Sequence, residues 1–154
     1  MEFKKIKEMS LEEIKQQSII IDASLSKRLN KKDPSKNTCV VNFKVIPGVI
    51  EKTIYLSLSE YINVKLSYKS PLEYNTSNIK AYARLSRGFR KSDGSEFNLV
   101  EVVFNKNVVK SFFLDDLDID NIKALGRDLK FIDRPDLNDD DVISNVVIPG
   151  YEEN

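Results

Sequence analysis

Apolar and polar positions alternate with a period of two through most of the middle of the chain. Such alternation is typical of β-strands, in which successive side chains point to opposite faces. It predicts strands over residues 38–46, 50–58, 62–68, 79–90, 97–104 and 108–114. The last three follow one another closely enough to form a meander, and Asp93-Gly94 between the first two of them is a strong hairpin turn signal. The chain is therefore predicted to be mainly β.

Two segments carry the signals of short helices. Ser10 and Glu13 form a Ser-x-x-Glu capping box, in which each side chain can bond to the free backbone amide of the other residue. A helix is predicted from there to about Gln17. A second helix is predicted over residues 116–125, because acidic residues occupy its first turn and Gly126 follows its last.

The predicted elements divide the chain into three parts. Residues 1–37 contain the first helix and then, from Leu25 to Asn37, a basic loop that we expect to be mobile. Residues 38–132 contain the strands, including a last one at 129–132, and residues 133–154 form an acidic tail that we expect to be largely unpacked. Five or six strands joined as successive hairpins, with one or two short helices, predict a small, partly closed β-barrel. The OB-fold is the leading specific candidate, although its usual helix lies between the third and fourth strands, where this sequence predicts only a loop.

The composition argues against an enzyme. The chain has no His and one Cys, whereas acid-base and nucleophilic chemistry near neutral pH most often uses these residues. It contains no phosphate-binding Gly-rich loop, no nucleophile elbow and no His-Glu-x-x-His motif. We therefore predict a binding protein without catalytic residues, metal or cofactor. Cys39 lies in an apolar run and is predicted to be a packed thiol.

Length and targeting signals indicate where such a protein works. A chain of 154 residues has the size of one domain. It has no run of 18 apolar residues, and its charged N-terminus does not lead into the apolar core of a signal peptide. A lone cysteine cannot form an internal disulfide. These features predict a cytoplasmic protein that makes no contact with membranes.

Charge is divided along the chain although its total is zero. Residues 1–92 hold 18 Lys and Arg against 9 Asp and Glu, whereas residues 93–154 hold 6 against 15. Such asymmetry favours nucleic-acid contact on the basic side and partner recruitment on the acidic side, although solvated charges that bind nothing would give the same totals. Apolar residues within 142–148 predict that the acidic tail docks on a protein partner or folds back onto the basic face.

A basic and aromatic face is predicted on the strand over residues 79–90 and its neighbours. Lys80, Tyr82 and Arg84 alternate with apolar residues and are expected to project together. Clustered cations attract a phosphate backbone, and an exposed ring stacks on bases. An ordinary solvent-facing strand with half-buried tyrosines would show the same alternation. The predicted nucleic-acid-binding residues are Lys65, Tyr68, Lys69, Lys80, Tyr82, Arg84, Arg87, Arg90 and Lys91.

A β-barrel with basic and aromatic strand faces and an acidic C-terminal tail resembles the single-stranded-DNA-binding proteins of phages and conjugative elements of low-GC Gram-positive bacteria. The resemblance covers residues 38–154 and is one of layout, without a matched motif. The tail departs from the family because it ends Tyr151-Glu152-Glu153-Asn154, where an apolar residue is usual. The resemblance implies a non-catalytic protein of a mobile genetic element that binds single-stranded DNA with little sequence specificity.

Two other classes of function are compatible with the sequence. One is a phage or plasmid protein-binding module, such as an inhibitor of a host defence protein whose acidic segment imitates DNA. This function needs carboxylates on a rigid surface. The other is an assembly protein that forms homo-oligomers through residues 1–22. The mass of the chain in solution, with and without those residues, distinguishes it from the others.

Overall fold

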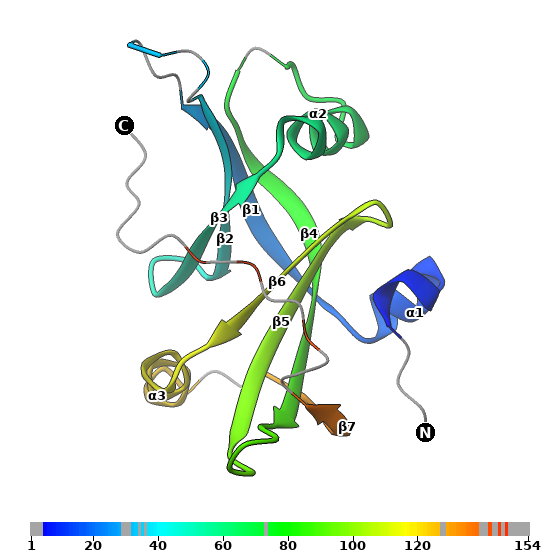
Figure 1. Ribbon diagram of the computed structural model, residues 1–154, viewed down its shortest axis with the longest axis vertical. Helices are drawn as coiled ribbons and strands as arrows, with labels where there is room; N and C mark the ends of the chain where they lie inside the picture. The colour runs from blue at the N-terminus through cyan, green and yellow to red at the C-terminus, as the bar shows by residue number, and fades with distance from the viewer. Residues whose placement is uncertain are drawn as a thin grey trace. The chain divides into compact units, whose positions relative to one another are not determined.

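The computed structural model shows a protein made mainly of strands (Figure 1). It describes residues 5–28, 32–33, 35, 37–72, 74–126, 129–138, 142, 145 and 147. Strands account for 50% and helices for 22% of the described residues, which confirms the predicted mainly β class with minor helix. Among these residues no helix is long and apolar enough to cross a membrane. The chain divides into two compact units, which are described separately.

The first unit combines residues 1–20 with residues 82–145. Its elements are the short 3₁₀ helix η1 (Ile6–Glu8), α1 (Leu11–Gln16), the second half of β4 (Thr76–Phe89), β5 (Glu96–Asn105), β6 (Val108–Leu114), α3 (Asp116–Ala124) and β7 (Ile132–Asn138). The second half of β4 pairs antiparallel with β5, and β5 pairs antiparallel with β6, so the predicted meander is confirmed. Both predicted helices are confirmed as well, each with a capping box at its start.

The second unit contains residues 21–81 and 146–154. Its elements are most of β1 (Ile19–Arg28), β2 (Thr38–Ile46), β3 (Ile50–Leu56), α2 (Leu58–Ser67) and the first half of β4. The strands lie in the order β3-β2-β1-β4, and α2 packs against β2 and β3 (Figure 1). Since α2 lies between the third and fourth strands, it has the place of the usual helix in an OB-fold. The fold class is consistent with the predicted small OB-like barrel.

The strand predicted over residues 62–68 is wrong, because this segment belongs to α2. A capping box at Ser57 and Glu60 starts the helix: the Glu60 amide donates to Ser57 Oγ at 3.1 Å, and the Ser57 amide donates to Glu60 Oε1 at 2.9 Å. Tyr61, Val64 and Lys65 are buried, at the three- and four-residue spacing of one helix face. Alternation at positions 62 to 68 is therefore coincidental, and the predicted strand over residues 50–58 ends at Leu56 instead.

The basic loop predicted from Leu25 to Asn37 is also partly wrong, since β1 continues to Arg28. Leu25 is fully buried and pairs with Val41 of β2. Ser24 and Ser26 are buried too, at positions where a strand usually has apolar side chains. Serines next to basic residues are typical of loops, which explains why the pattern did not indicate a strand here.

The predicted tail is packed at its start. The last strand was expected at 129–132, but β7 covers residues 132–138 and pairs parallel with β4. Leu137 is buried with Phe97 and Leu99. Gly88 of β4 makes room for this contact, because a Cβ there would lie 2.5 Å from Phe97 Cζ and 2.7 Å from the Leu137 carbonyl oxygen. The sequence did not predict β7 because Pro135 lies within it, and proline is rare inside strands. Proline is tolerated in an edge strand, which pairs on one side alone.

Single residues further along the tail also make contacts. Asn145 and Ser111 exchange two hydrogen bonds within the first unit, at 2.7 and 2.9 Å. In the second unit Val147 forms an isolated antiparallel bridge with Ile54 of β3. The predicted tail of residues 133–154 is therefore not unpacked at its described positions. Whether it docks on a protein partner stays a prediction.

The N-terminal segment packs within the first unit. Ile6, Met9 and Ile14 form a buried cluster with Val103 of β5. Leu11 of α1 is exposed. The cluster gives residues 6–14 a role in the core of their own chain. Homo-oligomer formation through residues 1–22 stays a prediction.

Truncation tests the role of β7. A chain that ends at residue 133 is expected to lose at least about 3 kcal/mol of unfolding free energy, because it lacks Leu137 and exposes Phe97 and Leu99. A chain that ends at Val147 keeps every described contact of this segment and is the matched comparison. Urea unfolding followed by circular dichroism measures both. Equal stability of the two truncated chains would contradict a structural role for β7.

Candidate functional site

The predicted basic face of β4 is not continuous. Its alternation is confirmed, since Ile79, Ala81, Ala83 and Leu85 are buried on one side. On the other side Lys80 is exposed, but Arg84 is fully buried, which contradicts the prediction that Arg84 projects into solvent. The N-terminal segment covers it: Arg84 Nη1 donates to Gln17 Oε1 at 3.3 Å and lies 3.2 Å from Met9 Sδ.

Lys65 is a second correction. It was predicted on the outer face of a strand, but it lies on the buried face of α2. Its Nζ donates to the Pro71 carbonyl oxygen at 2.7 Å and lies 5.1 Å from the centre of the Tyr61 ring. The long side chain thus satisfies its charge within the protein, and Lys65 is not available to a phosphate backbone.

The other predicted site residues of the second unit lie close together. Tyr68 is half-buried and its hydroxyl donates to the Lys80 carbonyl oxygen at 2.5 Å. The Lys80 ammonium forms an ion pair with Asp22 of β1. Lys69 is exposed and has a left-handed backbone conformation, with φ of 54°. Of these, Lys69 and Lys80 keep exposed side chains.

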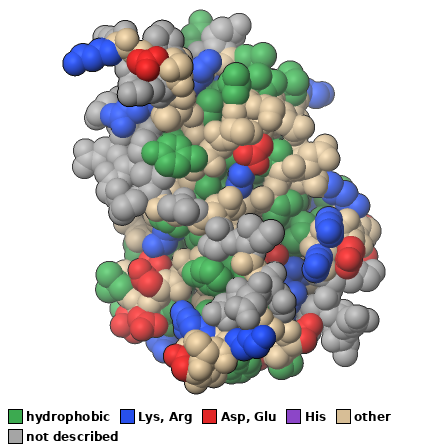
Figure 2. All heavy atoms as spheres, viewed as in Figure 1, with side chains coloured by type: hydrophobic (Ala, Val, Ile, Leu, Met, Phe, Trp, Pro, Cys, Tyr) green, Lys and Arg blue, Asp and Glu red, His purple; other side chains and the backbone are tan. Residues whose placement is uncertain are grey.

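The predicted site residues of the first unit are mostly bound to neighbours within that unit. Tyr82 is half-buried against the cluster that contains Ile6 and Val103. Arg87 pairs with Asp133 at 3.2 Å and with Glu96 at 3.8 Å. Arg90 donates to Ser95 Oγ and to the Glu96 carbonyl oxygen, and Lys91 is exposed. The face of the molecule seen in Figure 2 likewise shows Lys and Arg interspersed with Asp and Glu among its described residues.

Two arginines of the first unit converge on one carboxylate. Arg84 and Glu101 are paired residues of β4 and β5, and Arg84 Nε and Nη2 each lie 2.9 Å from Glu101 Oε1. Arg134 of β7 approaches the same oxygen, with its Nη1 at 3.4 Å. The side chains of Arg84, Glu101 and Arg134 are 1%, 16% and 7% exposed. Burial lowers the pKa of the Arg134 guanidinium, and the nearby Arg84 charge lowers it further.

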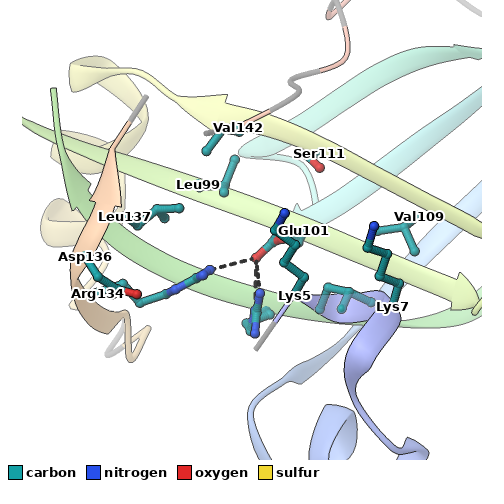
Figure 3. A pocket seen from close by; sticks show the side chains of 12 residues that line it. Lys5, Lys7, Leu99, Glu101, Val109, Ser111, Arg134, Asp136, Leu137 and Val142 are labelled. Atoms are coloured by element: carbon teal, nitrogen blue, oxygen red, sulfur yellow. Dashed lines mark hydrogen bonds and ion pairs between the residues drawn. The ribbon is translucent and has the colours of Figure 1, made fainter. Parts of the chain in front are cut away.

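These three residues line a cavity of about 630 Å³, here named the arginine cavity. Figure 3 shows Arg134 reaching Glu101 in it, with Lys5 and Lys7 entering from the N-terminal segment. Four of the lining residues are cationic and two, Glu101 and Asp136, are anionic. The whole lining consists of Lys5, Ile6, Lys7, Arg84, Leu99, Glu101, Val109, Ser111, Arg134, Asp136, Leu137 and Val142.

A second hollow, of about 370 Å³, lies in the second unit where the segment between β1 and β2 meets β3. We name it the Lys27–Tyr55 hollow after its exposed basic and aromatic residues. The Tyr55 residue is 52% exposed. The thiol of Cys39 is buried, as predicted, and burial raises its pKa. The lining residues are Lys27, Ser35, Asn37, Thr38, Cys39, Tyr55, Leu56 and Leu58.

No cluster of three or more His, Cys, Asp or Glu residues that could hold a metal ion occurs among the described residues. The structure thus offers two cavities as candidate sites, and neither was predicted from the sequence. Alternation could predict that Lys80 and Tyr82 lie on the same face of β4. It could not predict that β7 and the N-terminal segment pack against β4. Comparison with known proteins finds no matching family model, no matching curated protein and no matching solved structure.

Replacing Glu101 tests the balance of charge in the arginine cavity. Glu101→Gln is expected to destabilise the protein by about 3–5 kcal/mol, since it leaves two buried guanidinium groups without their shared carboxylate. Adding Arg134→Gln to this variant should recover part of the loss, because the repulsion between the Arg84 and Arg134 charges is then absent. Urea unfolding of the single and double variants measures both effects. A stable Glu101→Gln protein would show that the carboxylate is not needed to hold the arginines.

Proposed function

We propose that the protein binds single-stranded nucleic acid at the Lys27–Tyr55 hollow without catalysing a reaction. The observation that carries this proposal is a lysine and a half-exposed tyrosine at one hollow beside the segment that joins β1 and β2. OB-folds bind oligonucleotides on the face of strands 2 and 3 and at the loop between strands 1 and 2. The hollow has the corresponding place in the second unit.

The residues of the hollow suit the chemistry of a single strand. The Lys27 ammonium offers one charge to a phosphate group, and the Tyr55 ring offers a surface on which a base can stack. Leu58 is exposed at its edge and adds apolar contact area. A charge and an aromatic ring can contact a strand of any sequence, so we expect little sequence specificity.

The charge of the surrounding segment supports the same proposal. Residues 21–81 hold 10 Lys and Arg against 5 Asp and Glu. The basic surplus of the N-terminal half of the chain is thus shared by the segment that forms the hollow. A surplus of positive charge raises the local concentration of a polyanion and the rate at which it binds.

A salt series tests whether binding is electrostatic and where it occurs. Affinity for a fluorescent single-stranded oligonucleotide should fall as salt rises, with a log-log slope of about −0.7 for each phosphate neutralised. Lys27→Gln should make this slope less steep by about 0.7, whereas Lys69→Gln, which changes an exposed lysine outside the hollow, should leave it unchanged. Fluorescence anisotropy measures the series, with double-stranded DNA as the comparison. A flat salt response would remove the nucleic-acid proposal, and a reversed order of the two variants would remove the hollow as its site.

Removing the tyrosine ring tests stacking. Tyr55→Ala should weaken single-strand binding by about 1–3 kcal/mol, the usual contribution of one stacked base. The melting temperature should change little, because the tyrosine is 52% exposed. Tyr74→Ala is the matched control, since Tyr74 is 70% exposed in the same unit but does not line the hollow. Equal affinity of the two variants for the oligonucleotide would contradict stacking on Tyr55.

A further inference from the structure

We infer that α2 packs against the α2 helix of a second copy of this chain, so that the protein forms a weak symmetric dimer. The contact surface would be the side of α2 that faces away from the buried Tyr61, Val64 and Lys65. Apolar side chains are exposed there, since Leu58 is 55% and Leu66 is 62% exposed. Figure 2 likewise shows hydrophobic side chains gathered at the surface where Figure 1 places α2.

The exposed side of α2 has the two features that a helix needs to pack against its own copy. Leu58, Ile62 and Leu66 recur every four residues and form an apolar ridge. A row of shorter polar side chains runs beside the ridge, one position later: Ser59, Asn63 and Ser67. A two-fold axis that runs between the ridge and the row would place the ridge of each copy on the row of the other. The helices would then cross at about −50°, which is the commonest class of helix packing.

The ridge and the row carry no charge. Charged residues make up 31% of the chain, but α2 has only two of them, Glu60 and Lys65. Glu60 accepts from the Ser57 amide at 2.9 Å in the capping box, and Lys65 is buried. A two-fold axis brings each contact residue close to its own copy, so a charge there would meet a like charge, which is costly. The uncharged surface therefore suits a second copy of the chain better than it suits a nucleic acid.

The serines of the row are hydrogen-bonded within their own copy. Ser67 Oγ donates to the Asn63 carbonyl oxygen at 3.0 Å, and Ser59 Oγ lies 3.2 Å from Ser57 Oγ. Removing water from these hydroxyls therefore costs less free energy than removing it from hydroxyls without a partner. The apolar ridge of a second copy can thus cover the row.

The size of the contact determines the strength of the dimer. A helix of 10 residues is about 15 Å long and about 10 Å wide with its side chains. Two such helices bury less surface than the roughly 1,200 Å² in total that typical specific interfaces bury. We therefore expect a dimer that dissociates reversibly as the protein is diluted.

Sedimentation equilibrium of the full chain from about 1 μM to about 1 mM tests the inference. The average mass should rise with concentration from that of one chain towards that of two. Leu66→Glu should raise the dissociation constant at least about tenfold, because it places a charge in the buried ridge. Leu117→Glu is the matched control, since Leu117 is 67% exposed on α3, a helix of the other unit, and it should leave the mass unchanged. A mass of one chain at every concentration, or equal effects of the two variants, would overturn the inference.

A variant of the row provides the second part of the test. Ser67→Arg adds a long side chain where the ridge of the second copy would lie, and a cation near the C-terminal end of a helix is favourable, so α2 should remain folded. The dissociation constant should again rise at least about tenfold, with circular dichroism as the check on folding. A folded Ser67→Arg protein with an unchanged dissociation constant would also overturn the inference. Neither Leu66 nor Ser67 lines the Lys27–Tyr55 hollow, so the dimer is tested independently of nucleic-acid binding.

Discussion

The first unit depends on the buried contact between Arg84 and Glu101. These residues are opposite one another in the antiparallel pairing of β4 and β5, so their contact is fixed by the register of the two strands. A slip of one strand by one residue would place the two side chains on opposite faces of the sheet and break the contact. Removing Glu101 would take the shared carboxylate away from two buried guanidinium groups. The ion pair and the alternation of buried apolar residues thus favour the same register.

The same pair of residues also contacts two segments that pack against this sheet. The N-terminal segment supplies Met9 and Gln17 to the Arg84 guanidinium, and β7 supplies Arg134 to the Glu101 carboxylate. Each combines a few buried side chains with one polar contact to this pair. The pair therefore connects residues that are far apart in the chain.

Much of the fold could be predicted from the sequence, because local signals there agreed with the tertiary structure. The meander followed from alternation and from Asp93-Gly94, and two of the helices followed from their capping residues. The third helix, α2, has the same capping box at Ser57 and Glu60, but alternation at the next positions obscured it. The sites were harder to predict. Whether Arg84 is buried depends on which segments cover β4. The burial of Arg134 depends on β7, a strand that contains a proline. Neither can be predicted from the local sequence pattern.

The division of charge along the sequence has a different meaning once the strands are paired. In the first unit, basic residues of β4 meet acidic residues that come later in the chain: Arg84 contacts Glu101, and Arg87 contacts Glu96 and Asp133. Several basic residues of the N-terminal half therefore form ion pairs with acidic residues of the C-terminal half, and these pairs lie within one unit. The segment over residues 21–81 keeps a surplus of five positive charges, since its 10 Lys and Arg face only 5 Asp and Glu. The first unit has no such surplus, since residues 1–20 and 82–145 hold 14 Lys and Arg against 17 Asp and Glu. A polyanion would for this reason be attracted to the second unit rather than to the first.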